Sequence, residues 1–288
     1  MIRQRPVELL APARNVECAM AAVDHGADAV YIGAPRFGAR ASAGNSVEDI
    51  ARLVEYAHTF RVKVYVTVNT ILKDEELPET ERLVWALYRV GVDALIVQDM
   101  ALLELDLPPI PLHASTQMDN RTPEKVKFLH GLGFSQVVLA RELSLAEIQA
   151  VHEACDVPLE VFVHGALCYC YSGQCLFSSM LGGRSGNRGR CAQPCRLSYE
   201  VMDEKKHPVK TGKKERDLYI LSPKDLCTVS MIPELIENGV DSFKIEGRMK
   251  QPEYAAGVVS VYRKYIDYYI NACLRTDEVT AKKDFKVT

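Results

Sequence analysis

Eight short apolar runs typical of β-strands recur along this chain, separated by segments with a helical pattern. The runs cover residues 7–11, 29–33, 63–68, 94–97, 112–115, 137–140, 160–163 and 242–245. The intervening segments, such as 81–88 and 145–154, place apolar residues at spacings of three and four, as a helix packed on a sheet requires. Most of the runs follow a glycine-containing turn of the kind that ends helices. The turns include those at Gly26, Gly91, Gly133 and Gly239.

Repeated βα units predict a parallel sheet, and eight of them in about 250 residues predict an α/β fold of the (β/α)8 TIM-barrel type. An open doubly wound sheet is the alternative. With 288 residues, 48% hydrophobic and 25% charged, the chain has the composition of a globular protein, so we expect one domain over residues 1–288. Segment 166–221 follows the seventh strand as a cysteine-rich, basic insertion, which we expect over the C-terminal face of the barrel. Its apolar runs 197–202 and 218–221 flank a polar stretch and predict a small hairpin.

Polar side chains follow six of the predicted strands. Sites on this fold lie at the C-terminal ends of the strands, so these side chains should surround one pocket. Any one of them could be polar only because strand ends are exposed to solvent. Polar side chains at six strand ends, however, indicate a binding site. The residues are Asn69, Gln98, Asp99, Thr116, Gln117, Arg141, Glu142, His164, Glu246 and Arg248.

Six of the nine cysteines fall between Cys168 and Cys227, in a stretch interrupted by glycines. The first residues contain no apolar signal core, and no apolar run approaches the roughly 20 residues that span a bilayer, so we expect a cytoplasmic protein with no membrane partner. In that compartment, clustered cysteines are more often metal ligands or redox groups than disulfides. Disulfides and inert buried thiols are the alternatives. Thiolates on a flexible loop can converge on one soft metal centre.

The strongest ligand set is Cys168, Cys175, Cys191 and Cys195, with six, fifteen and three intervening residues. Structural zinc sites usually contain two short Cys-x2-Cys-like pairs, and only the last pair here resembles one. Because a cluster held by four thiolates tolerates less regular spacing, the sequence favours an iron-sulfur cluster, with zinc as the alternative. Cys170 and Cys227 are the alternative ligands.

The charge of the chain is uneven. The formal net charge is −3, but residues 184–216 contain ten Lys or Arg and four Asp or Glu. Basic residues concentrated beside a candidate active face, among them Arg188 and Arg190, are suited to RNA phosphates. A solvated surface hairpin explains the same charge equally well.

Two motifs resemble those of peptidase family U32, the collagenase-like protease family. The first is Glu160-Val-Phe-Val-His-Gly-Ala-Leu-Cys-Tyr-Cys-Tyr-Ser-Gly-Gln-Cys-Leu-Phe-Ser, and the second is Asp241-Ser-Phe-Lys-Ile-Glu-Gly-Arg-Met-Lys. The resemblance extends over nearly the whole chain. Segments 37–46 and 113–125 are most similar to the branch of ribosomal RNA cytidine hydroxylases. Other branches hydroxylate a wobble uridine in transfer RNA or a ubiquinone precursor.

The resemblance implies a barrel, oxygen-independent hydroxylation and an iron-sulfur cluster, expected as 4Fe-4S, on Cys168, Cys175, Cys191 and Cys195. It also implies a requirement for prephenate in the RNA branches. Members of the cytidine hydroxylase branch are usually longer, so we expect a missing C-terminal region or a second subunit to contribute RNA-binding modules. Cys170 and Cys227 are additional thiols that the resemblance leaves unassigned.

Proteolysis has little support in the sequence. No Gly-x-Ser-x-Gly elbow is present, and His152-Glu-Ala-Cys-Asp lacks the second histidine of a zinc-peptidase helix. A thiol peptidase that pairs a loop cysteine with His164 is one alternative. A non-catalytic iron-sulfur or zinc protein that binds RNA or assists assembly is another.

The sequence therefore predicts an iron-sulfur RNA hydroxylase that forms 5-hydroxycytidine or 5-hydroxyuridine in ribosomal or transfer RNA and needs an electron or hydroxyl donor. Arg141, Lys244 and Arg248 are expected to bind carboxylate or phosphate, and His164 or Glu246 to move protons. We count His164, Glu246 and Arg141 as candidate catalytic residues. The candidate substrate-binding residues are Asn69, Gln117, Lys244, Arg248, Arg188 and Arg190.

Overall fold

A computed structural model describes residues 7–40, 43–209 and 218–287. Eight parallel strands form a closed barrel, because β6 and β7 pair and complete the ring. All eight predicted runs contain a strand, so the predicted barrel is confirmed and the open sheet is wrong. The strands are β1 (Glu8–Ala13), β2 (Ala29–Gly33), β3 (Lys63–Val68), β4 (Ala94–Val97), β5 (Leu112–Ala114), β6 (Gln136–Val138), β7 (Leu159–Gly165) and β11 (Ser242–Ile245).

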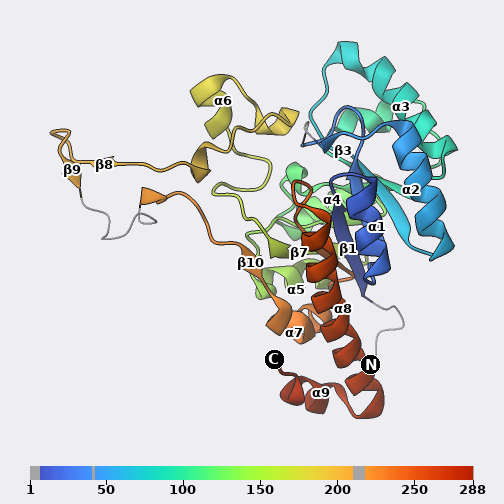
Figure 1. Ribbon diagram of the computed structural model, residues 1–288. Helices are drawn as coiled ribbons and strands as arrows, with labels where there is room; N and C mark the ends of the chain where they lie inside the picture. The colour runs from blue at the N-terminus through green and yellow to red at the C-terminus, as the bar shows by residue number, and fades with distance from the viewer. Residues whose placement is uncertain (1–6, 41–42, 210–217, 288) are drawn as a thin grey trace.

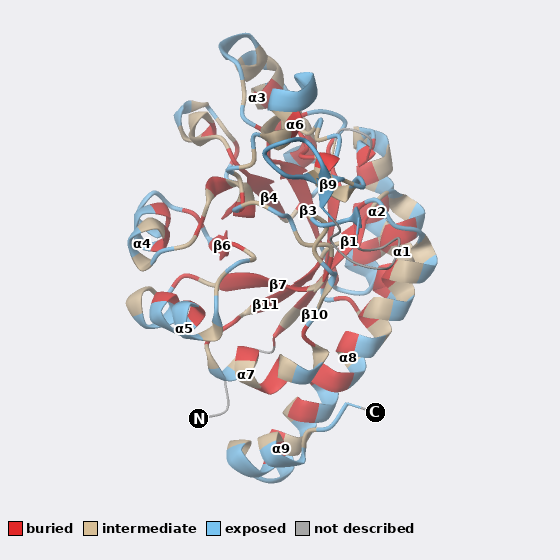
Figure 2. Cartoon of the chain, turned by 90° about the vertical axis from the view of Figure 1, so that its left-hand side faces the viewer, coloured by how far each residue is buried: buried red, intermediate tan, exposed pale blue. Residues whose placement is uncertain are grey.

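Helices surround the barrel, with buried faces toward the strands and exposed faces outward (Figure 2). They are α1 (Val16–Asp24), α2 (Val47–Thr59), α3 (Leu77–Arg89), α4 (Pro123–Gly131), α5 (Leu145–Ala154), α7 (Ile232–Glu237) and α8 (Pro252–Arg275), with α9 (Glu278–Asp284) packed on α8. After β4 the chain forms a 3-10 helix, Met100–Glu104, in place of an α-helix. The glycine turns are confirmed: Gly239, for example, has φ of +90°, and a Cβ there would lie 2.1 Å from the His152 ring.

The strands separate two layers of side chains. Leu9, Val30 and Leu95 belong to the large apolar core that includes the helices, whereas Leu10 and Tyr31 belong to a separate cluster within the barrel. The barrel interior also contains polar groups, including His113, Thr67, Glu160 and Lys244, all buried. A polar barrel interior open at one end is a suitable floor for a binding site.

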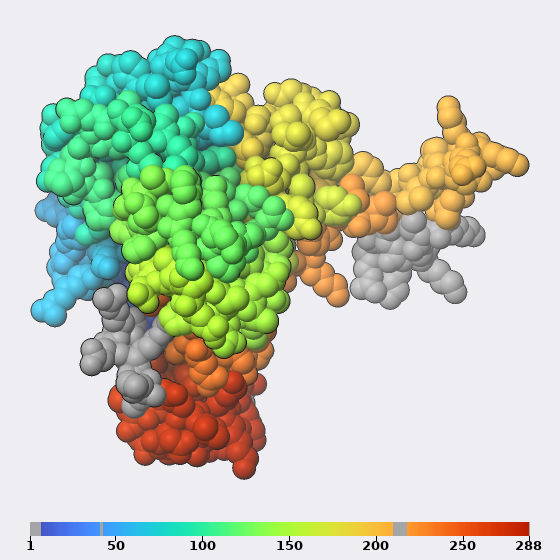
Figure 3. Space-filling view, turned by 180° about the vertical axis from the view of Figure 1, so that it is seen from behind, coloured from blue at the N-terminus to red at the C-terminus, as the bar shows by residue number. Residues whose placement is uncertain are grey.

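The insertion contains α6 (Phe177–Gly182) and an antiparallel pair, β8 (Val201–Met202) and β9 (Pro208–Val209). The predicted hairpin is present, but its second strand is β9 and not the run 218–221. The Asp203 carboxylate accepts hydrogen bonds from the backbone N–H groups of Lys205 and His207, both at 2.8 Å, which closes a short turn. The hairpin projects away from the barrel (Figures 1 and 3).

After the hairpin, β10 (Leu226–Cys227) pairs antiparallel with the end of β7 and returns the chain to the barrel. Among the described residues, no helix has the length and apolar character needed to cross a membrane.

Candidate functional site

A cavity of about 800 Å³ lies between the C-terminal ends of the barrel strands and the insertion. Its barrel side includes Tyr31 of β2, Thr67 of β3, Phe162 of β7 and Lys244 of β11. Its other wall comes from residues between 166 and 196. This is the end of the barrel at which the fold places its sites.

All four predicted metal ligands, Cys168, Cys175, Cys191 and Cys195, line this cavity. Burial raises the pKa of the Cys175 thiol, and the neighbouring thiols of Cys170, Cys191 and Cys168 raise it further. Burial also raises the pKa of Cys195, with contributions from Cys168 and Cys191. The four thiols therefore share one cavity.

This donor set fits a soft metal centre. Four thiols around one cavity are the ligands of an iron-sulfur cluster or of structural zinc. Within the part of the chain that the structure describes, no three His, Cys, Asp or Glu side chains are already arranged to hold a metal ion. Binding would therefore draw the sulfurs together and remove their protons, since the thiolate is the ligand.

The loop that carries the cysteines is held by contacts with its neighbouring segments and with the barrel. Arg196 donates to the carbonyl oxygens of Leu167, at 2.6 Å, and Pro223, at 2.8 Å. Gly173 packs directly on the backbone of Gln117, where a Cβ would lie 2.1 Å from the carbonyl oxygen, and its φ is +75°. Glycine is therefore needed between Cys168 and Cys175 for the loop to lie on the barrel.

Glu246 lies among cations at the cavity wall. Its Oε2 lies 2.8 Å from Arg141 Nη2. Burial raises the pKa of Glu246, but Arg141, Arg40, Arg248 and Lys244 together outweigh burial and lower it to about 2. A carboxyl group with this pKa stays ionised at neutral pH and is a poor proton carrier. The geometry therefore favours Glu246 as a counter-ion over the predicted proton transfer.

Two further predicted residues reach the cavity from the barrel interior. Lys244 Nζ lies 2.5 Å from Glu160 Oε1, and the side chains of this pair are 5% and 0% exposed. Arg248 Nη1 donates to Thr67 Oγ1 at 2.7 Å, while its buried Nε has no hydrogen-bond partner in the part of the chain that the structure describes. Both cations thus form part of the cavity floor. A residue that binds an anionic ligand in the cavity has to line it, and both residues do.

Asn69 and Gln117 also line the cavity. The amide of Asn69 is occupied at both ends, since Oδ1 accepts from Ala39 N at 2.9 Å and Nδ2 donates to Ser115 Oγ at 3.1 Å. It fixes the backbone next to Arg40, a cavity residue that the strand-end pattern missed. The sequence feature that could have identified Arg40 is the segment 37–46, which carries the family resemblance. The Gln117 carbonyl oxygen accepts from Gln98 Nε2 at 3.2 Å.

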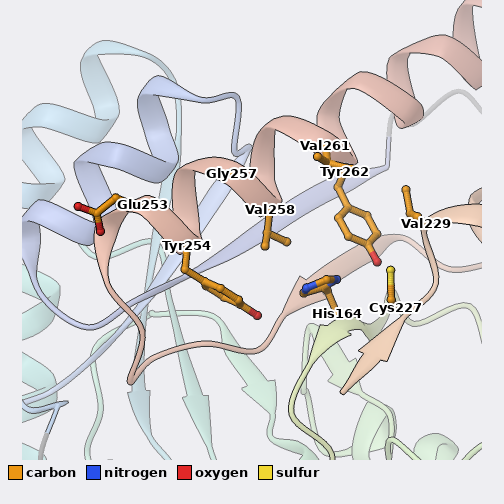
Figure 4. A pocket seen from close by; sticks show the side chains of 9 residues that line it. All are labelled: His164, Cys227, Val229, Glu253, Tyr254, Gly257, Val258, Val261 and Tyr262. Carbon is orange, nitrogen blue, oxygen red and sulfur yellow. The ribbon is translucent and has the colours of Figure 1, made fainter. Parts of the chain in front are cut away.

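His164 does not line the cysteine cavity. Its ring lies against α8, with centroids 5.7 Å from Tyr262 and 6.1 Å from Tyr254. Together with Cys227 it lines a second, largely apolar cavity of about 350 Å³ (Figure 4). Strand alternation predicts His164 on the same side as Phe162, but the pairing of β7 with β11 shifts register there. Burial lowers the pKa of His164.

The two predicted phosphate-binding arginines have different surroundings. Arg188 forms a bidentate ion pair with Glu76, at 2.6 and 2.7 Å, and does not line the cavity. Arg190 is exposed and lines the cavity with Arg184. Four other basic residues of the predicted patch lie outside the described residues: Lys210, Lys213, Lys214 and Arg216.

The cavity is strongly cationic. Among the described residues, eight basic side chains line it, against the two carboxylates of Asp225 and Glu246. Such an excess of positive charge in a concave site attracts anionic ligands. The basic residues are Arg40, Arg141, Arg184, Arg190, Arg196, Lys244, Arg248 and Lys250.

Fold and site define a (β/α)8-barrel protein with a thiol-lined, cationic cavity at the C-terminal end of the barrel. Residues 14–287 match the model of peptidase family U32, and the chain belongs to this family. A solved structure, the U32 peptidase Mk0906, shares the fold with a TM-score of 0.53 at 14% identity, over 85% of this chain and 95% of that one.

Curated relatives are named for different activities. The chain is 53% identical over 264 residues to the 23S rRNA 5-hydroxycytidine C2501 synthase of Escherichia coli, and 42% identical to tRNA hydroxylation protein P1 of Bacillus subtilis. It is 36% identical to a collagenase of Porphyromonas gingivalis. These matches cover 92%, 93% and 92% of this chain but 40%, 65% and 66% of the relatives. The chain thus spans two fifths of the first relative.

Proposed function

We propose that this chain is the barrel part of an RNA hydroxylase, which forms 5-hydroxycytidine in ribosomal RNA and acts in the cytoplasm. The observation that carries the proposal is the meeting of four thiols and a strongly cationic wall in one cavity. The similarity to RNA-hydroxylating relatives supports it. A pyrimidine of transfer RNA is the alternative substrate.

Cys168, Cys175, Cys191 and Cys195 would hold an iron-sulfur cluster, expected as 4Fe-4S, with zinc as the alternative. When bound, such a cluster supplies electron transfer or a binding point for the oxygen source. Arg40, Arg141 and Arg248 would bind a phosphate of the RNA or the carboxylates of a hydroxyl donor such as prephenate. Lys244 is paired with Glu160 at the cavity floor, and Glu246 holds Arg141 in place.

Peptidase activity is the second candidate, supported by one observation. Cys227 of β10 pairs with His164 of β7 in the antiparallel ladder, and both line the smaller cavity. A thiol beside an imidazole is the arrangement that a thiol peptidase needs. The Cys227→Ala variant separates the candidates, because a peptidase would lose its activity while the proposed hydroxylase would not.

The direct test is the modified nucleoside itself. The chain is expressed in a bacterial strain that lacks its own ribosomal RNA cytidine hydroxylase, and RNA nucleosides are quantified by mass spectrometry. We expect 5-hydroxycytidine to return in ribosomal RNA, either with the chain alone or after the C-terminal region of the Escherichia coli relative is fused to it. Unmodified cytidine and uridine in both cases would contradict the proposal and favour a binding or assembly role.

Neutralising Arg190 should weaken RNA binding, because its exposed guanidinium lines the cavity. For Arg190→Gln we expect the slope of log Kd against log salt to fall by about 0.7–0.9, the loss of one phosphate contact. Arg188→Gln is the matched control, since Arg188 is paired with Glu76. Fluorescence anisotropy with a labelled RNA measures both variants. Equal salt slopes in the two variants would show that Arg190 makes no contact with an RNA phosphate.

A further inference from the structure

Two tyrosines stand at the rim of the cysteine cavity and take no part in the roles above. Tyr169 and Tyr171 both line the cavity, yet 58% of each residue is exposed. A side chain that borders a cavity and still faces solvent lies at its entrance. Both rings are therefore placed to touch whatever enters.

The ring of Tyr171 is held in position. The next residue, Ser172, is buried, and its N–H and hydroxyl donate to the Glu142 carboxylate, both at 2.9 Å. The Arg121 guanidinium lies 4.4 Å from the centroid of the Tyr171 ring, and Asp119 pairs with Arg121 at 2.5 Å. A ring fixed from one side loses little freedom when a flat partner stacks on it.

Charge at the entrance indicates the partner. Arg184 and Arg190 are exposed and line the same cavity as the tyrosines. Guanidinium groups for phosphates beside aromatic rings for bases are the combination with which proteins bind unpaired nucleic acid. A cavity of about 800 Å³ is also in the size range of sites that enclose a small ligand, such as one nucleotide.

A base that enters this cavity cannot remain stacked between its neighbours in an RNA helix. An enzyme that acts on a base inside a helix has to bind it unpaired or flipped out, and this costs the stacking with its neighbours. We propose that Tyr169 and Tyr171 stack on the bases that flank the target nucleotide, so that the site selects single-stranded or flipped-out RNA. The inference rests on the proposed RNA substrate and makes these tyrosines positioning residues.

The test is binding of a short labelled RNA, as a single strand and annealed to its complement, to the full chain purified without oxygen. Tyr169→Ala and Tyr171→Ala should each weaken single-strand binding roughly tenfold, with little change for the duplex. The salt slope should stay that of the wild type, because no phosphate contact is lost. Tyr→Phe at either position should keep wild-type affinity, whereas Tyr→Leu, which has bulk but no ring, should behave like alanine.

Phe128→Ala is the matched control, since Phe128 is 56% exposed on α4 and does not line the cavity. Wild-type affinity in the alanine and leucine variants would overturn the stacking role and leave the proposed function intact. A wild-type chain that binds neither RNA form at low salt would overturn both. Variants that change self-association of the chain but not RNA affinity would assign the rim to a protein contact and overturn the inference.

Discussion

Replacing Cys175 with alanine should abolish both the iron-sulfur cluster and RNA hydroxylation. The Cys175 thiol lines the cavity and interacts electrostatically with the thiols of Cys168, Cys170 and Cys191. Three remaining thiolates leave one iron without its protein ligand, so iron and acid-labile sulfide should fall well below the wild-type content. Metal and sulfide analysis, the visible absorption spectrum and nucleoside mass spectrometry measure the effect.

The matched control is Cys155→Ala, because Cys155 follows α5 and does not line the cavity. It should leave cluster and modification unchanged. Single substitutions of Cys170 and Cys227 decide whether either thiol is a ligand, and we expect both variants to keep iron. Full modification in cells that contain only the Cys175→Ala variant would exclude the cluster from the mechanism. Stoichiometric zinc in the wild type would replace the redox proposal with a structural one.

The barrel was predictable because its signals are local. Each strand is a short apolar run, and each helix end carries its own signal, as at Gly239, where only glycine tolerates both the positive φ and the approach of His152. Eight consecutive βα units of this kind then close into a barrel. The grouping of the four cysteines in one cavity was predictable for the same reason, since they are close in sequence.

The remaining features of the site depend on contacts between distant segments. The register shift between β7 and β11 moves His164 away from the cavity, and no local pattern signals it. Arg188 pairs with Glu76, 112 residues away, a contact that charge composition does not indicate. Arg40 enters the cavity from the loop after β2, beyond the strand end where polar residues were sought. Charge composition predicts a cationic site but not which cations are already paired.

Lys244→Met should cost the protein about 3–5 kcal/mol of unfolding free energy, the usual penalty when one partner of a buried ion pair is removed. Lys244 and Glu160 lie inside the barrel, and Glu160 is fully buried. Without Lys244, the only hydrogen bond to the Glu160 carboxylate from the described residues is that from Gln136 Nε2, at 2.6 Å. An uncompensated buried charge is the physical cause of the loss.

Urea unfolding followed by circular dichroism measures this prediction. The control is Lys63→Met on β3, because Lys63 is 59% exposed and the Glu8 carboxylate, 3.7 Å away, still accepts hydrogen bonds from Tyr65 and Ser242 without it. The loss of stability should therefore be much smaller than at Lys244. Adding Glu160→Gln to Lys244→Met removes the unpaired buried carboxylate and should recover a large part of the lost stability. If Lys244→Met unfolds at the wild-type urea concentration, the pair does not stabilise the barrel.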